Sequence, residues 1–145
     1  MNTFFSPEEE QKIIEAIAQA ELRTSGEIKL HVESRCWFSA ISRAKKVFEK
    51  LEMHRTAQKS GVLIYIAVDS KKFAIIGDSG INEKVGRDFW ESTKEIMELE
   101  FKQGRFFEGA MKGIESAGEQ LLSYFPFQKD DSNELSNDIS YGKKL

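Results

Sequence analysis

The chain has 145 residues, 40% of them hydrophobic and 31% charged, which is the composition of an ordinary globular protein and predicts one domain. Its net charge of −3 argues against nucleic-acid binding, because contacts to phosphates depend on a basic field.

The N-terminus and the single cysteine predict a cytoplasmic monomer. The opening residues MNTFFSPEEEQ have neither the basic start nor the apolar run of a secretory signal. The longest apolar run, VLIYIAV, is far shorter than the roughly 20 residues of a membrane span. A lone Cys36 excludes an internal disulfide and suits a reducing compartment.

The first predicted elements are a helix and a strand with one polar face. Ser6 and Pro7, followed by three glutamates, are typical of a helix start, and isoleucines at helical spacing extend the helix to about residue 22. In EIKLHVES (27–34) apolar and polar residues alternate, which indicates a strand near the sheet edge or with a poorly covered face. His31 falls on the polar side, where we expect a surface or half-buried histidine.

A helix over 39–53 and a β-hairpin follow. GVLIYIAVD (61–69) is apolar on both faces, so it predicts a central strand covered by helices on both sides. SKK forms a polar turn, and KFAIIGD (72–78) returns as the second strand of the hairpin.

Two further helices and a tail complete the pattern. One helix is predicted from Asn82 or Glu83 to near Gly104, and a second runs from about 106 to 124 before Pro126 stops it. Residues 127–145 lack periodicity, so we expect a domain over 1–126 and a disordered C-terminal tail.

The order of the elements predicts an α/β fold. A strand–helix–strand crossover makes strands 27–34 and 61–69 parallel, and the hairpin makes the third strand antiparallel. We therefore expect a small three-layer, Rossmann-like α/β/α sandwich with a mixed sheet of three to four strands.

This topology brings three polar segments to one edge of the sheet, where the first two strands begin and the third ends. Glu27, Asp78 and Glu83 could supply hard oxygen ligands to Ca²⁺ or Mg²⁺ there, while Ser79 and Gly80 could donate to a phosphate. The alternative is structural, because Asp78 can also close a turn and cap a helix.

The opposite edge is a rival site, ranked second because the hairpin turn crowds it. The rule for open α/β sheets places ligands beyond the carboxyl ends of parallel strands. Glu33, Ser34, Arg35, Cys36 and Trp37 follow the first strand there, together with the turn residues Asp69 and Ser70. Cys36 and Trp37 could equally contact a protein partner.

Several segments resemble the TPM-domain family. They are RTSGEIKLHVES, LEMHRTAQKSGVLIYIAVDSKKFAIIGDSGINEKVG, FKQGRFFEGAMKGI and LLSYFP, and the chain is most similar to the short, soluble bacterial members. The resemblance implies a Rossmann-like sandwich, an association with acid phosphatase activity, and divalent-metal binding by acidic residues near the strand ends. Those residues correspond here to Glu27, Asp78 and Glu83, although many members read G-x-G-[LI]-E where this chain reads GDSGIN.

Two functions therefore stand as hypotheses. The first is a divalent-cation-binding domain with weak acid phosphatase activity, in which Asp78 is catalytic and a phosphate ester is the substrate. The second is a non-enzymatic interaction module that regulates a membrane or stress-response partner. Exposure of Trp37, Phe38 or Trp90 would favour the second.

Overall fold

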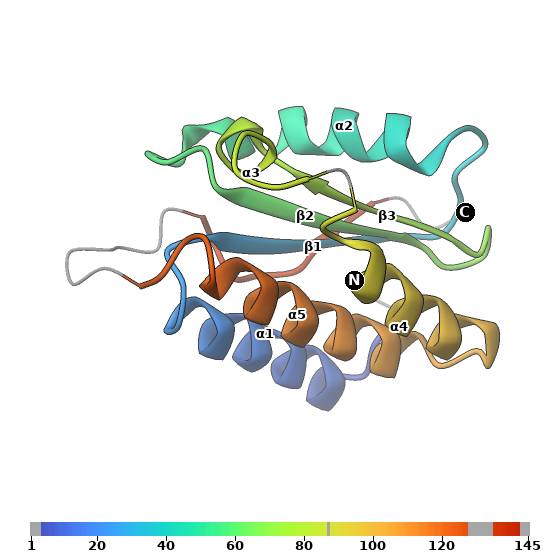
Figure 1. Ribbon diagram of the computed structural model, residues 1–145. Helices are drawn as coiled ribbons and strands as arrows, with labels where there is room; N and C mark the ends of the chain where they lie inside the picture. The colour runs from blue at the N-terminus through green and yellow to red at the C-terminus, as the bar shows by residue number, and fades with distance from the viewer. Residues whose placement is uncertain (1–3, 87, 128–134, 143–145) are drawn as a thin grey trace.

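A four-stranded sheet with helices on both faces forms the protein, as the computed structural model shows for residues 4–86, 88–127 and 135–142 (Figure 1). Helix α2 covers one face, and α1, α4 and α5 cover the other. The predicted α/β sandwich is thus confirmed. The sheet has the strand order β3-β2-β1-β4, and its strands are β1 (Glu27–Glu33), β2 (Gly61–Ala67), β3 (Lys72–Gly77) and β4 (Ser140–Tyr141).

The helices begin and end close to the expected residues, except in the region that follows β3. They are α1 (Pro7–Glu21), α2 (Ala40–Lys50), α3 (Ser79–Asn82), α4 (Glu91–Lys102) and α5 (Phe106–Leu122), with a 3₁₀ turn at Met53–Arg55. At the start of α1 the Ser6 hydroxyl accepts a hydrogen bond from the Glu9 amide, and the Glu9 carboxylate accepts one from the Ser6 amide. This reciprocal cap satisfies two amides that would otherwise lack partners.

Strand β2 lies at the centre of the sheet, as its two apolar faces predicted. It pairs in parallel with β1 and antiparallel with β3. Val62, Ile64 and Ile66 face the core under α1 and α5, whereas Leu63 and Tyr65 face the smaller core under α2. Both faces of β2 pack against apolar side chains, which favours apolar residues at every position and explains its uninterrupted apolar run.

The helix expected from Asn82 or Glu83 onward is wrong, because the structure contains two helices there. The short α3 ends at Asn82, and α4 begins only at Glu91. Between them Val85 and Phe89 pack against the main core and Trp90 is buried. Contacts of these side chains with the core therefore determine the backbone here, and no single helix runs through Gly86.

The expected disordered tail is also wrong for residues 135–142, which we call the C-terminal segment. Its strand β4 pairs in parallel with β1, and the Gly142 amide donates to the Val32 carbonyl. Leu135 and Ile139 are buried, one in each core. Residues 128–134 and 143–145, which belong to the same predicted tail, lie outside the described residues.

Polar side chains of β1 hold the C-terminal segment in place. The Glu27 carboxylate accepts from the Leu135 amide, and the Lys29 ammonium donates to the Ser136 carbonyl. His31 adds a hydrogen bond to the Ser140 hydroxyl. The poorly covered face that the sequence predicted for β1 is therefore covered by a segment more than 100 residues away along the chain.

Candidate functional site

The first candidate site lies where β1 and β2 begin and β3 ends, and its backbone segments meet as predicted. The Glu27 amide donates to the Ser60 carbonyl at 3.2 Å, and the Asp78 amide donates to the Gly61 carbonyl at 2.9 Å. Glu27 lies opposite Gly61 in the sheet register, and Asp78 follows the residue paired with Val62. Glu27 and Asp78 therefore occupy one row across three strands.

Asp78 is the central carboxylate at this edge and is only 4% exposed. Its Oδ1 accepts from the Ser79 amide at 2.7 Å, which makes it the cap of α3, and lies 3.0 Å from Nδ1 of His54. Its Oδ2 is buried and has no hydrogen-bond partner among the described residues. Leaving such an oxygen without a partner is costly, so its environment calls for explanation.

Glu27 and Glu83 do not share the position of Asp78. Glu27 is buried and accepts from the Leu135 amide at 2.6 Å. Between Glu27 and Asp78, the space above Gly61 is filled, since an added Cβ there would lie 3.5 Å from the Met53 methyl and 3.8 Å from Leu135 Cδ1. Glu83 is exposed at the C-terminal end of α3.

Within the described ranges, no group of three or more His, Cys, Asp and Glu side chains is arranged to hold a metal ion. A cation at this edge could draw on Asp78 together with backbone oxygens and water. Those are ligand types that Ca²⁺ and Mg²⁺ accept.

Ser79 and Gly80, the predicted phosphate donors, are both engaged in local structure. The Ser79 amide is hydrogen-bonded to Asp78. A Cβ on Gly80 would lie 2.1 Å from the Gln58 carbonyl oxygen and 2.6 Å from that of Lys59. Glycine is therefore required here because the 58–59 loop crosses directly over the backbone.

The rival edge, at the carboxyl ends of β1 and β2, holds a buried polar cluster centred on Glu33. Its carboxylate accepts from Arg43 through Nε at 2.8 Å and Nη2 at 2.9 Å, and from the Tyr65 hydroxyl. Its Oε1 is also 3.0 Å from Nε2 of His31. Burial disfavours the charge, but the hydrogen bonds from Arg43, His31 and Tyr65 outweigh it and lower the pKa of Glu33 well below its ordinary range.

His31 connects this cluster to the C-terminal segment. Its ring stacks on Tyr65 with centroids 5.8 Å apart, and its Nδ1 lies 2.8 Å from the Ser140 hydroxyl. The sequence placed His31 on a polar face but did not reveal Tyr65 and Ser140 as its partners, because they come from β2 and β4. The one available signal was the run of polar residues on alternate positions of β1.

A groove opens above this cluster because α2 packs on β2 and β3 and leaves the polar face of β1 to the C-terminal segment. The groove has a volume of about 540 Å³. Its floor includes His31 and Glu33, one wall comes from α2, and the opposite wall includes Ser140, Tyr141 and Gly142.

Two aromatic side chains at the end of the groove are exposed. Trp37 is 74% exposed and Phe38 is 44% exposed, whereas Trp90 is buried. The aromatic exposure that favours an interaction module is thus present at Trp37 and Phe38 and absent at Trp90.

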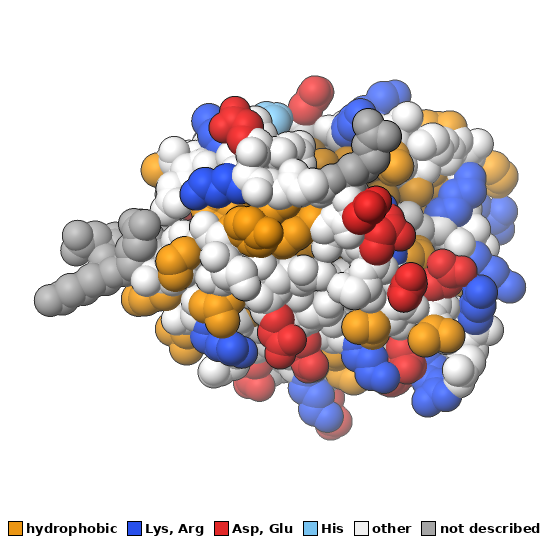
Figure 2. Space-filling model, in the orientation of Figure 1, with side chains coloured by type: hydrophobic (Ala, Val, Ile, Leu, Met, Phe, Trp, Pro, Cys, Tyr) orange, Lys and Arg blue, Asp and Glu red, His pale blue; other side chains and the backbone are white. Residues whose placement is uncertain are grey.

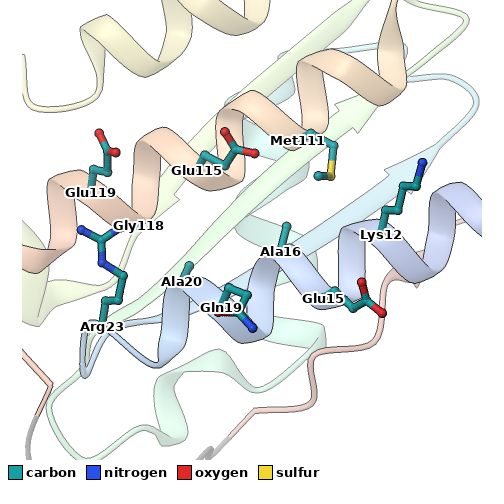
Figure 3. A pocket seen from close by; sticks show the side chains of 10 residues that line it. All are labelled: Lys12, Glu15, Ala16, Gln19, Ala20, Arg23, Met111, Glu115, Gly118 and Glu119. Atoms are coloured by element: carbon teal, nitrogen blue, oxygen red, sulfur yellow. The ribbon is translucent and has the colours of Figure 1, made fainter.

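A second hollow, of about 550 Å³, lies between α1 and α5 (Figure 3). Ala16, Ala20 and Gly118 line the seam between the helices, while Lys12 and Arg23 alternate with glutamates around the rim. A Cβ on Gly118 would lie 2.9 Å from the Ala20 Cβ, so the small residues serve close helix packing. The rim carries two basic and three acidic side chains, and these charges do not converge on one point.

The comparisons with known proteins agree with this architecture. The family model described as the TPM domain matches residues 1–120. The chain belongs to the TPM domain family. No curated protein matches it significantly.

Several solved structures resemble this TPM domain, including those of two bacterial proteins. The NMR structure of BA42 protein from the psychrophilic bacterium Bizionia argentinensis is 48% identical, with 98% of each chain covered and a TM-score of 0.91. The N-terminal domain of cg2496 protein from Corynebacterium glutamicum is 12% identical, with 86% of this chain and 79% of that chain covered and a TM-score of 0.59. The second likeness extends to the fold alone.

Among the described residues of this TPM domain, no helix has the length and apolar character needed to cross a membrane.

Proposed function

We propose that this TPM domain binds a divalent cation, Ca²⁺ or Mg²⁺, with Asp78 as the principal ligand. The observation that carries the proposal is the buried Oδ2 of Asp78, which has no hydrogen-bond partner among the described residues. A cation would supply the missing interaction, because hard divalent ions prefer carboxylate oxygens.

The surroundings of Asp78 fit such an ion in part. The 58–59 loop brings two backbone carbonyl oxygens against Gly80, and carbonyls and water commonly complete the shell of Ca²⁺. Glu83 stays a candidate ligand, because its amide donates to the Ser79 carbonyl and its side chain is exposed one turn away. Glu27 is assigned no share, since Met53 and Leu135 stand between it and Asp78.

Weak acid phosphatase activity is the chemistry that this cation would support. A bound divalent ion can orient a phosphate ester and lower the pKa of a water molecule that attacks it. Asp78 would hold the ion, and Ser79 and Gly80 would lie beside the phosphate. The substrate would be a phosphate ester.

Titration of the ¹⁵N-labelled protein with Ca²⁺ tests the cation site. We expect saturable shifts of the amides at 54, 58–59 and 77–83, and we expect Asp78→Asn to weaken binding at least tenfold. Glu27→Gln is the matched control, because it alters a buried carboxylate of the same edge that we place outside the site. Equal affinity of Asp78→Asn and wild type, or shifts confined to other segments, would overturn the assignment.

Turnover of p-nitrophenyl phosphate at mildly acid pH tests the catalytic part separately. The wild type should be active only with Ca²⁺ or Mg²⁺, and Asp78→Asn should lose this activity while remaining folded. Activity that persists in Asp78→Asn would show that Asp78 is not catalytic, even if it binds the ion.

A further inference from the structure

The groove above Glu33 carries an inference that is independent of the cation site, because the two lie at opposite ends of the strands. Of the described residues that line it, three are basic, namely Arg35, Arg43 and Lys50, and one, Glu33, is acidic. A basic groove is unexpected in a chain with a net charge of −3. Elsewhere, on the face that carries α4 and α5, acidic and basic side chains are interspersed (Figure 2).

The single acidic side chain is already neutralised within the protein. Both carboxylate oxygens of Glu33 accept hydrogen bonds from Arg43. The Arg43 side chain is 30% exposed, and its third nitrogen, Nη1, lies outside this pair. Glu33 thus orients the guanidinium at the groove floor and cancels one positive charge, but the groove stays cationic.

The other two basic residues have no acidic partner within the part of the chain that the structure describes. Neither Arg35 nor Lys50 forms an ion pair with a described residue. The Arg35 guanidinium lies 5.5 Å from the centroid of the Trp37 ring, a cation–π contact that leaves its N–H groups available. An anionic ligand would therefore meet unpaired donors.

The aromatic rim of the groove is held in a fixed position. The Cys36 amide donates to the Ser70 hydroxyl at 2.9 Å, and the Lys72 ammonium donates to the Cys36 and Phe38 carbonyls at 3.2 and 3.1 Å. Trp37 thus lies on a loop that hydrogen bonds hold in place, and its side chain is exposed instead of packing against the core. Exposed Trp and Arg on a rigid support are typical of the residues that dominate protein interfaces.

We propose that this groove binds an acidic peptide segment of a partner protein. Acidic side chains of the segment pair with Arg35, Lys50 and the outer edge of Arg43, and an apolar side chain packs on Trp37 and Phe38. Charge complementarity selects an acidic ligand. The concave groove between α2 and the C-terminal segment favours an extended peptide over a flat lipid surface, because a bilayer would leave the floor empty.

The proposal can be tested with a set of fluorescein-labelled peptides of about 12 residues. Each peptide combines acidic residues, Glu or Asp, with the apolar residues Leu or Phe, and the order of the residues varies across the set. Matched peptides carry Lys or Ser at the acidic positions. We expect binding of acidic members only, weakened by salt, with amide shifts at 35–50 and 140–142 and a blue shift of Trp37 fluorescence. If no acidic member binds with a Kd below about 1 mM, the proposal is overturned.

Charge-reversal variants locate the binding. Arg35→Glu combined with Lys50→Glu should weaken the best peptide at least tenfold. The control combines Lys12→Glu with Arg23→Glu at the α1–α5 hollow, which makes the same change of net charge and should leave the affinity unaltered. Equal loss in both double variants would reduce the effect to net charge and overturn the groove assignment.

Other anionic ligands give distinguishable results. Tighter binding to phosphatidylglycerol vesicles than to any peptide would assign the surface to membranes and overturn the peptide proposal. Full competition by millimolar inorganic phosphate, with shifts confined to Arg43, would assign a small-anion site and overturn it as well.

Discussion

Glu21 is the side chain whose protonation should most clearly change stability at neutral pH. It is the last residue of α1, and its Oε2 accepts from the Ile28 amide at 2.9 Å. Burial raises the pKa of Glu21 from 4.5 to about 7. The hydrogen bond from Ile28 and the charge of Lys29 oppose this rise, and the nearby charge of Glu27 adds to it.

The sign of the effect follows from proton binding. A carboxyl group with a higher pKa in the folded state holds its proton more tightly there, so the free energy of unfolding falls as pH rises from 4.5 to about 7. A shift of this size corresponds to about 3 kcal/mol at 1.36 kcal/mol per pKa unit, and the full penalty is present above pH 7. Glu21→Gln removes the charge and keeps an oxygen for the Ile28 amide.

Urea denaturation at pH 4.5 and pH 8 measures this prediction. Glu21→Gln should match the wild type at the lower pH and exceed its free energy of unfolding by up to about 3 kcal/mol at the higher one. Glu119→Gln, at an exposed position of α5, is the control and should change little at either pH. A Glu21→Gln variant that is no more stable than the wild type at pH 8 would refute the reasoning.

Two further substitutions probe the packing around the sites. Gly80→Ala should lower the free energy of unfolding by about 2 kcal/mol or more, because its Cβ would clash with backbone carbonyls, while Gly86→Ala, in open space, should cost almost nothing. Equal urea midpoints for the two would contradict this. Leu135→Ala should lower the free energy of unfolding by about 2–3 kcal/mol and speed hydrogen exchange of the Gly142 amide. An unchanged free energy of unfolding would show that the C-terminal segment adds no stability.

The elements that the sequence predicted well are those whose pattern reflects burial on a whole face. The run VLIYIAV predicts a central strand because both faces of β2 are covered, and no local alternative explains seven consecutive apolar residues. The start of α1 was equally clear, since Ser6, Pro7 and Glu9 each suit one position of a helix start.

The elements that were missed depend on contacts between distant segments. Val85 and Phe89 have helical spacing, yet they reach the core from an irregular stretch, because packing overrode local periodicity. The C-terminal segment has no periodicity at all. Its two-residue strand is held by β1 side chains, which no local pattern of residues 135–142 could reveal.

The candidate sites divide in the same way. Topology alone predicted that the backbone around Glu27, Gly61 and Asp78 would meet, and it does. Side-chain direction was not predictable, because it depends on Met53 and Leu135, which fill the space above Gly61. At this edge the strand order was sufficient to predict which backbone segments meet, but not whether two carboxylates can share an ion.

The polar face of β1 explains why both the C-terminal segment and the groove exist. Since α2 sits over β2 and β3, alternate residues of β1 lack a helix above them, and apolar side chains there would face water. Lys29 and His31 instead hold the segment 135–142, while Glu33 turns to Arg43 on α2. The groove remains where these two sets of partners diverge. The cationic wall of the groove thus follows from the position of α2. Replacing a basic side chain of this wall, such as Lys50, should change the binding of the proposed acidic peptide without changing the fold.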